Sequence, residues 1–195
     1  MRHAPGLAEP PGPRAVHRPT PPNPVKLSAG LSGEAMETLI GHVAGFLLGM
    51  VVANAGEWTV HKYILHGLGR QPGSVWNYHL NEHHRSALLH GMVDPGYRGW
   101  PIRWNTQGKE VLLLASIVLL NLPLLSFVPG YVAGLYCSLV CYYFHHRKAH
   151  LDPAWARRNL PWHWEHHMVG SPEANWCTTW PWFDWVMGTR VRSRE

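Results

Sequence analysis

The stretch Tyr131-Val-Ala-Gly-Leu-Tyr-Cys-Ser-Leu-Val-Cys-Tyr-Tyr-Phe144 decides the fold, because it leads directly into His145-His146-Arg-Lys-Ala-His150. Its 14 residues carry no charge and would form a helix of roughly 21 Å. The run at residues 111–128 is also apolar, and Pro129-Gly130 between the two runs is a turn signal. We therefore predict a helical hairpin in a membrane, whose second helix leaves the lipid as a histidine-bearing segment. A buried hairpin in a soluble protein is the alternative.

A third apolar run precedes the histidines. Residues 38–56 are 19 uncharged residues, about the length that crosses a hydrocarbon core. Ser32 is the expected N-cap of this helix. Eight of the 17 prolines lie within residues 1–26, which prevents regular structure there. The predicted organisation is a disordered Pro-rich tail over residues 1–33 and one membrane-embedded domain over residues 34–195.

The predicted topology places residues 57–109 and 145–195 on the same face of the membrane. These two segments hold 13 of the 17 Lys and Arg residues and all 11 Trp residues. Basic residues favour the cytoplasmic side, and tryptophan favours the membrane interface. We therefore predict an all-α integral membrane protein with a helical, histidine-rich, metal-binding cap on the cytoplasmic face. Four basic residues in the tail fall on the opposite side, which a re-entrant first segment would avoid.

The sequence argues against several other classes of protein. Three cysteines without a CxxC pair fit neither a disulfide framework nor a zinc ribbon. No GxGxxG motif opens a dinucleotide-binding unit, and the HExxH motif of zinc hydrolases is absent. A basic, Trp-rich face is compatible with nucleic acid, but that function would not require paired histidines beside membrane helices. No nucleic-acid partner is predicted.

Twelve of the 15 histidines follow residue 60, and all but His90 fall into four clusters. The clusters are His61-Lys-Tyr-Ile-Leu-His66, His79-Leu-Asn-Glu-His83-His84, His145-His146-Arg-Lys-Ala-His150 and His163-Trp-Glu-His166-His167. Ten or so convergent histidines exceed the three or four ligands of one zinc site, so we predict two metal ions.

Helical spacing predicts which rings share an ion. Side chains four apart lie on one side of an α-helix. The pairs with this spacing are His79 with His83, His146 with His150, and His163 with His167. His61 and His66 are five apart, about 140° around a straight helix, so they are predicted to reach different ions unless that helix is distorted.

A repeat of the histidine positions suggests two similar half-sites. Adding 84 to positions 61, 66, 79 and 83 gives 145, 150, 163 and 167, all of which are histidine. We hypothesise that two half-sites, each following a membrane helix, face each other across a dimetal centre. The alternative is coincidence in a histidine-rich chain.

The four boxes resemble those of the fatty-acid hydroxylase and sterol desaturase superfamily, and the resemblance covers about residues 40–190. It includes Glu57-Trp-Thr-Val-His61 at the first box and the closing segment Asn175-Trp-Cys-Thr-Thr-Trp-Pro-Trp-Phe-Asp184-Trp-Val-Met-Gly188-Thr189. The first box is also similar to that of bacterial β-carotene hydroxylases. Their usual end lacks the Asp-x-x-x-Gly-Thr pattern, which favours a more general lipid hydroxylase.

The resemblance implies a non-haem di-iron centre that uses O2 as co-substrate, although imidazole ligands also accept zinc. The implied ligands are His61, His66, His79, His83, His84, His146, His150, His163, His166 and His167. His145 substitutes for His146 if the third box has the five-residue spacing, and His90 is a further candidate. Glu82, Glu165, Asp152 and Asp184 are candidates for orienting ligand imidazoles, with surface or helix-end roles as the alternative. The substrate-channel candidates are Trp162, Trp164, Trp180 and Trp182, with interfacial anchoring as the alternative.

The function expected from this resemblance is hydroxylation of a membrane lipid, such as a fatty acyl chain, with electrons from a separate ferredoxin or cytochrome-type partner. A lipid or sterol desaturase or a carotenoid hydroxylase would use the same centre. A membrane metal-binding protein without oxidase activity is the non-enzymatic alternative.

Overall fold

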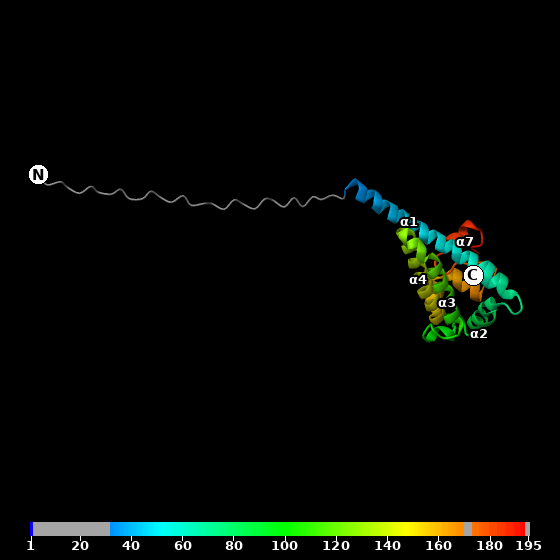
Figure 1. The fold of residues 1–195 in the computed structure, drawn as a ribbon. Coiled ribbons are helices and arrows are strands. Elements are labelled where there is room, and N and C mark those ends of the chain that lie inside the picture. Colours follow the sequence, from blue (N-terminus) through cyan, green and yellow to red (C-terminus); the bar gives the residue numbers. More distant parts are fainter. Residues whose placement is uncertain (2–31, 170–172, 194–195) are drawn as a thin grey trace.

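The structure is a computed structural model that describes Met1, residues 32–169 and residues 173–193. Every regular element in these ranges is helical, which confirms the predicted all-α class (Figure 1). The predicted disordered tail falls almost entirely on residues 2–31, which lie outside the described residues. The elements are α1 (Gly33–Thr59), η1 (Val60–Gly67), η2 (Leu68–Arg70), η3 (Val75–Asn77), η4 (His79–His84), α2 (Arg85–Leu89), η5 (Pro95–Arg98), α3 (Thr106–Asn121), η6 (Leu122–Ser126), α4 (Pro129–Leu151), α5 (Pro153–Asn159), α6 (Pro161–Met168) and α7 (Trp182–Val186).

The first helix is longer than the apolar run predicted. It begins after the predicted N-cap, Ser32, whose hydroxyl accepts a hydrogen bond from the amide of Ala35 at 3.3 Å. It continues through α1 into the π-helical segment η1 and ends with the short helix η2 at Arg70. The first histidine box therefore lies near the C-terminal end of the same continuous helical segment that carries the apolar run.

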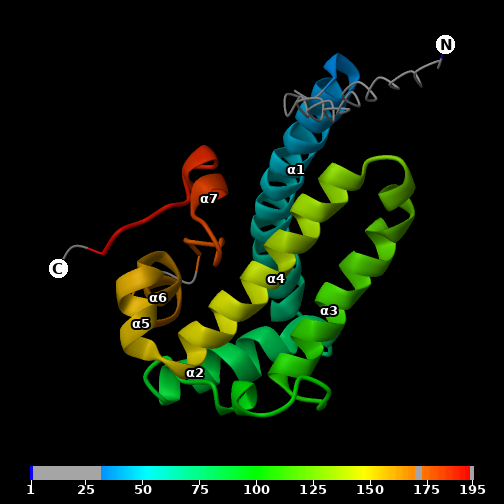
Figure 2. The ribbon, with the colours of Figure 1, turned by 90° about the vertical axis from the view of Figure 1, so that its left-hand side faces the viewer.

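The predicted hairpin is present as α3, the 3-10 helix η6 and α4, which run antiparallel beside each other (Figure 2). The Tyr136 hydroxyl on α4 donates a hydrogen bond to the carbonyl of Val118 on α3 at 2.7 Å. On the other side of α4 from α3 lie the short helices α5 and α6, and α6 carries the last histidine box. This arrangement brings the ends of α1 and α4 to the same region.

Small residues allow α1 and α4 to pack with their backbones in contact. Gly45 and Gly49 on α1 face Gly130 and Gly134 on α4, so each helix presents a GxxxG pair to the other. A methyl group added at Gly45 would stand 3.0 Å from the amide nitrogen of Tyr131, and one added at Gly49 or Gly134 would collide with a carbonyl group of the other helix. Helices that associate in lipid commonly use this small-residue contact.

Substituting one of these glycines tests the contact. We expect Gly134→Ala to reduce the free energy of unfolding by about 1–3 kcal/mol, because the added methyl meets backbone that cannot move aside. Gly41→Ala is the matched control, since nothing lies within 4 Å of its added methyl group. We expect that change to be neutral or stabilising by up to about 1 kcal/mol. Thermal unfolding of both variants in detergent measures the difference, and equal stability would contradict the packing described.

Two helical segments are long and apolar enough to cross a membrane, namely Gly33–Arg70 and Thr106–Ser126. Only 11% and 6% of their most apolar stretches are buried within the protein, whereas the core helix of a soluble protein would be mostly buried. The exposed side chains include large aliphatic residues such as Ile40, Leu47 and Leu120. The apolar run at residues 131–144, within α4, is instead partly covered by α1 and α3.

Candidate metal centre

Ten histidines from four segments meet at the end of α1 and α4. Their rings come from η1, η4, the last turns of α4, and α6. All but His84 are buried. They are the ten positions that the resemblance implies as ligands, and they form two groups.

The first group contains His61, His66, His79 and His84, whose donor nitrogens all lie within 4.8 Å of one another. Three Nε2–Nε2 distances define it: 3.0 Å from His61 to His79, 3.1 Å from His66 to His84, and 3.2 Å from His84 to His79. His166 adds a fifth ring to this group, and its Nε2 lies 3.3 Å from the Nε2 of His84.

The second group contains His83, His146, His150 and His167, again with donor nitrogens within 4.8 Å. His163 adds a fifth ring to this group, and its Nε2 lies 3.1 Å from the Nε2 of His150. The two groups meet where the rings of His84 and His167 stack, with centroids 4.1 Å apart. Each group thus assembles five imidazoles.

The backbone of the first two boxes contradicts one predicted pairing and meets the exception stated for His61 and His66, since the helix is distorted there. His61 and His66 belong to one group, because η1 is a π-helix in which residues five apart are hydrogen-bonded neighbours. The segment η4 is also π-helical, so His79 pairs with His84 five residues on, and His83 points to the other group. The predicted sharing of one ion by His79 and His83 is therefore wrong.

The second half of the chain follows the predicted spacing. His146 and His150 are four apart on the α-helix α4 and fall in one group. His163 and His167 are four apart on α6, with ring centroids 4.6 Å apart, and both lie with the second group. Two histidines five residues apart in a π-helix and two histidines four residues apart in an α-helix are thus both placed in the same group.

Two similar half-sites do face each other, but the equivalent histidines are not all separated by 84 positions in the sequence. The ring of His83 lies 5.0, 4.3 and 4.9 Å from the rings of His146, His150 and His167. The ring of His166 lies 4.6, 5.0 and 4.9 Å from the rings of His61, His66 and His84. The equivalent residues are therefore His61 and His146, His66 and His150, His79 and His163, His84 and His167, and His83 and His166, 83 to 85 positions apart. The pairings of His61 with His145 and of His83 with His167 are wrong, because only the first half is π-helical.

The two additional ligand candidates lie outside the centre. His145 stacks beside Trp155 with centroids 5.9 Å apart, because the next residue on α4, His146, is the one that faces the cluster. His90 is exposed, and its Nδ1 lies 2.8 Å from the carbonyl oxygen of Ser86. The ambiguity in the third box is resolved in favour of His146.

The ring nitrogens of the cluster have the spacing expected of ligands that share a metal ion. Two nitrogens bound to one ion at about 2.0–2.1 Å stand about 2.9–3.4 Å apart for bond angles from 90° to tetrahedral. The observed Nε2–Nε2 distances of 3.0–3.3 Å match this spacing. Burial lowers the pKa of His79, His163 and His167 well below the usual range, and that of His166 to about 4, so these rings are neutral.

The outward ring nitrogens indicate which tautomer is present. Several Nδ1 atoms face oxygen acceptors, so each is assigned the ring proton, which leaves the Nε2 lone pair directed into the cluster. The Nε2 of His83 and both ring nitrogens of His167 have no hydrogen-bond partner in the protein although they are buried. A buried ring nitrogen whose lone pair has no partner in the protein is expected of a metal ligand.

The carboxylates that orient the ligands differ from the predicted candidates. Asp94 Oδ2 lies 3.0 Å from Nδ1 of His83, and Glu110 Oε1 lies 2.5 Å from Nδ1 of His146. The Tyr97 hydroxyl is a further partner of His146 at 3.1 Å. These three residues were missed, because they lie in a loop and at the start of α3, outside the histidine boxes.

None of the four predicted carboxylates is hydrogen-bonded to a histidine in the described structure. Glu82 pairs with Lys109, and Glu165 pairs with Arg190. Asp152 caps α5 by accepting a hydrogen bond from the amide of Trp155. Each therefore has a structural or surface role.

Asp184, the fourth candidate, acts on the centre through the closing segment. Its carboxylate accepts hydrogen bonds from the amides of Trp176 at 2.9 Å and Cys177 at 2.8 Å, and from the Thr189 hydroxyl at 2.7 Å. The segment so held presents the Trp176 carbonyl to Nδ1 of His61 at 2.5 Å. It also presents the Ala174 carbonyl to Nδ1 of His166 at 2.7 Å. The Asp-x-x-x-Gly-Thr pattern thus supports the first group of histidines.

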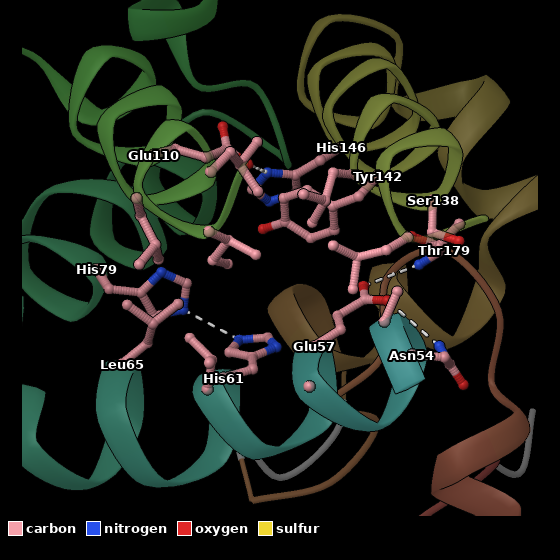
Figure 3. Close-up of a pocket in the computed structure, with 18 of the residues that line it drawn as sticks. Asn54, Glu57, His61, Leu65, His79, Glu110, Ser138, Tyr142, His146 and Thr179 are labelled. Atoms are coloured by element: carbon pink, nitrogen blue, oxygen red, sulfur yellow. Dashed lines mark hydrogen bonds and ion pairs between the residues drawn. The ribbon is translucent and has the colours of Figure 1, made fainter. Parts of the chain in front are cut away.

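An apolar cavity of about 310 Å³ adjoins the histidines between α1, α3 and α4 (Figure 3). Both groups contribute to its wall, the first through His61 and His79 and the second through His83 and His146. Away from the histidines the wall is mainly apolar, although it includes the carboxylates of Glu57 and Glu110, and it extends along α3 to Asn121. No Lys or Arg is among the described residues that line it.

The four tryptophans that were candidates for a substrate channel lie in different places, and one of them borders the cavity. Trp180 lines the cavity. Trp182 stacks against Trp180 with centroids 5.1 Å apart and is 42% exposed. Trp162 and Trp164 pack instead against Ala149, Ala156 and their neighbours on the far side of α4. The walls of the cavity come from the apolar helices, since these carry the side chains that face one another.

No family model, curated protein or solved structure matches the chain. The relationship to fatty-acid hydroxylases and sterol desaturases is therefore a proposal that rests on the histidine boxes and the closing segment.

Proposed function

We propose that this protein is a membrane-embedded, histidine-ligated di-iron oxidase that hydroxylates a lipid. The main observation behind the proposal is that both five-histidine groups border one apolar cavity, which lies between three apolar helices. A metal centre for small polar substrates would not need such a cavity. When bound, a di-iron pair would supply O2 activation and abstraction of hydrogen from an unactivated C–H bond.

The membrane setting follows from the exposed apolar surfaces. The two segments long enough to cross a bilayer leave nearly all of their most apolar stretches uncovered, and lipid is the solvent that suits such a surface. The distribution of Lys, Arg and Trp supports a cytoplasmic location for the histidine-rich end. A lipid would then enter the cavity from within the bilayer.

The cavity would bind the uncharged part of that lipid. Its wall is mainly apolar, and burying an anionic headgroup there would be costly because the described lining includes two carboxylates and no Lys or Arg. The half-buried carboxylate of Glu57 accepts hydrogen bonds from the amides of Thr178 and Thr179, and both Glu57 and Thr179 line the cavity (Figure 3). We expect the headgroup to remain outside while the hydrocarbon portion lies against the histidines.

Oxygen-isotope labelling tests the proposed reaction. The full chain in lipid nanodiscs, loaded with Fe2+ and supplied with a ferredoxin or cytochrome-type reductant, would be incubated with 18O2 and candidate acyl, sterol and carotenoid lipids. Mass spectrometry is expected to show a product that has gained one 18O atom. A product that has instead lost two hydrogens would identify a desaturase. Iron-loaded protein that consumes no O2 with any lipid would favour the membrane metal-binding alternative.

Filling the cavity is expected to reduce turnover without removing metal. Leu113→Trp places an indole in the cavity wall, so we expect kcat/KM to fall by at least about tenfold. Leu112→Trp is the matched control, because Leu112 is 56% exposed and does not line the cavity. Unchanged turnover by the Leu113→Trp variant, with its metal content intact, would show that the substrate does not occupy this cavity.

A further inference from the structure

The two half-sites allow equivalent histidines to be compared, and their outward partners differ in charge. Nδ1 of His61 faces the backbone carbonyl of Trp176 at 2.5 Å. Nδ1 of its counterpart, His146, faces the Glu110 carboxylate at the same distance of 2.5 Å (Figure 3). A neutral carbonyl in the first group is thus replaced by a carboxylate in the second.

A second equivalent pair shows the same difference. Nδ1 of His166 faces the Ala174 carbonyl at 2.7 Å, whereas Nδ1 of His83 faces the Asp94 carboxylate at 3.0 Å. Both carboxylates are buried, with Asp94 3% and Glu110 5% exposed. No described residue places a carboxylate on a histidine of the first group.

Among the remaining rings, more Nδ1 atoms have a hydrogen-bond partner in the second group than in the first. Nδ1 of His150 faces the Met92 carbonyl at 2.8 Å, whereas Nδ1 of the equivalent His66 is buried without a partner. Nδ1 of His163 lies 3.4 Å from the Thr178 hydroxyl. More rings of the second group are therefore fixed in orientation.

These contacts have a direct consequence for metal affinity. A carboxylate that accepts a hydrogen bond from Nδ1 makes the lone pair of Nε2 a stronger metal ligand and fixes the orientation of the ring. Loss of such a carboxylate typically weakens metal binding about 10–100-fold. Two buried carboxylates beside five imidazole rings also favour a cation at that position.

We infer that the two metal positions are inequivalent, and that the second group (His83, His146, His150, His163 and His167) binds the first ion and binds it more tightly. Asp94 and Glu110 are the positioning residues that set this order. The inference rests on the proposed dimetal centre, but it does not require oxidase activity.

Metal titration tests the order of binding. The full chain in detergent, stripped of metal by a chelator, would be titrated with Co2+ and followed by its d–d absorption bands. We expect two steps separated by about tenfold or more in affinity. His150→Ala should remove the tight step and leave the weak one, whereas His66→Ala, the equivalent change in the first group, should do the reverse. Two indistinguishable steps, or loss of the weak step in His150→Ala, would overturn the inference.

Neutralising the carboxylates tests their role. Asp94→Asn and Glu110→Gln should each weaken the tight step about 10–100-fold and leave the weak step unchanged. Glu82→Gln is the matched control, because Glu82 precedes His83 but pairs with Lys109 at the surface. Equal weakening of both steps would contradict the assignment. If either carboxylate variant fails to fold, the comparison of His150→Ala with His66→Ala decides the question alone.

The outcomes separate this inference from the proposed function. Ordered binding of two Co2+ ions without lipid oxidation by the iron-loaded protein would defeat the proposed reaction and leave the inference standing. Lipid oxidation by a protein that binds both ions with equal affinity would do the opposite.

Discussion

His146→Ala is expected to abolish lipid oxidation and to remove the ion held by the second group of histidines, whereas His145→Ala should do neither. The two residues are adjacent on α4, but only His146 faces the cluster, where its ring lies 4.7 Å from that of His150 and 5.0 Å from that of His83. His145 lies beside Trp155 instead. We expect activity to fall by at least about a thousandfold in the first variant, since the reaction requires both ions.

The adjacent pair supplies its own control. Both variants lose one imidazole from the same helical turn, so a general effect on folding would affect both. Metal content by elemental analysis and product formation by mass spectrometry are the two measurements. An inactive His145→Ala variant beside an active His146→Ala variant would mean that the third box has the five-residue spacing and that the ligand assignment is wrong.

Asp184→Ala is expected to lower the free energy of unfolding by about 3–6 kcal/mol and to reduce metal binding by the first group. The substitution leaves the buried amides of Trp176 and Cys177 without their acceptor. Each such loss costs about 1–3 kcal/mol, and more where the partner was charged. The segment would then no longer hold its carbonyls against His61 and His166.

Thermal unfolding in detergent measures this effect, with an expected fall in Tm of roughly 10 °C or more. Asp152→Ala is the control, because Asp152 is a partly exposed helix cap whose loss should lower Tm less. If Asp184→Ala were no less stable than Asp152→Ala, the closing segment would not depend on this carboxylate.

The sequence was sufficient to predict the helical class, the hairpin and the ten clustered histidines. Apolar runs and turn signals define helices locally, so Ser32 and the histidine-bearing end of α4 were predicted correctly. The connector was placed slightly too late, because Pro129 and Gly130 form the first turn of α4. The histidine boxes are likewise local patterns. Their convergence follows once the apolar helices that precede them lie side by side.

The grouping of the rings could not be predicted from helical spacing alone. The five-residue intervals from His61 to His66 and from His79 to His84 match a π-helix, but that backbone is rare enough that an α-helix is assumed by default. In retrospect, the HxxxxH spacing was the signal. An α-helical reading assigns His83 to the wrong group because it misplaces the ring by about one residue.

The partners of the ligands were missed because they are distant in sequence. Asp94 lies 11 residues from His83, and Glu110 lies 36 residues from His146. A carboxylate beside an apolar run resembles an ordinary interfacial residue, and only the packing of α3 against α4 brings Glu110 to the cluster. The tryptophans show the converse problem, since their abundance near the boxes does not determine which of them face the cavity.

Metal identity and stoichiometry test the central claim most directly. The full chain would be enriched with 57Fe, purified anaerobically in detergent, and examined by elemental analysis and Mössbauer spectroscopy. We predict about two irons per chain and the signal of a coupled di-iron pair, as expected for two nitrogen-rich sites in contact. One zinc ion per chain, or no tightly held metal after loading with iron, would contradict the di-iron oxidase and favour a protein that binds metal without oxidising lipid.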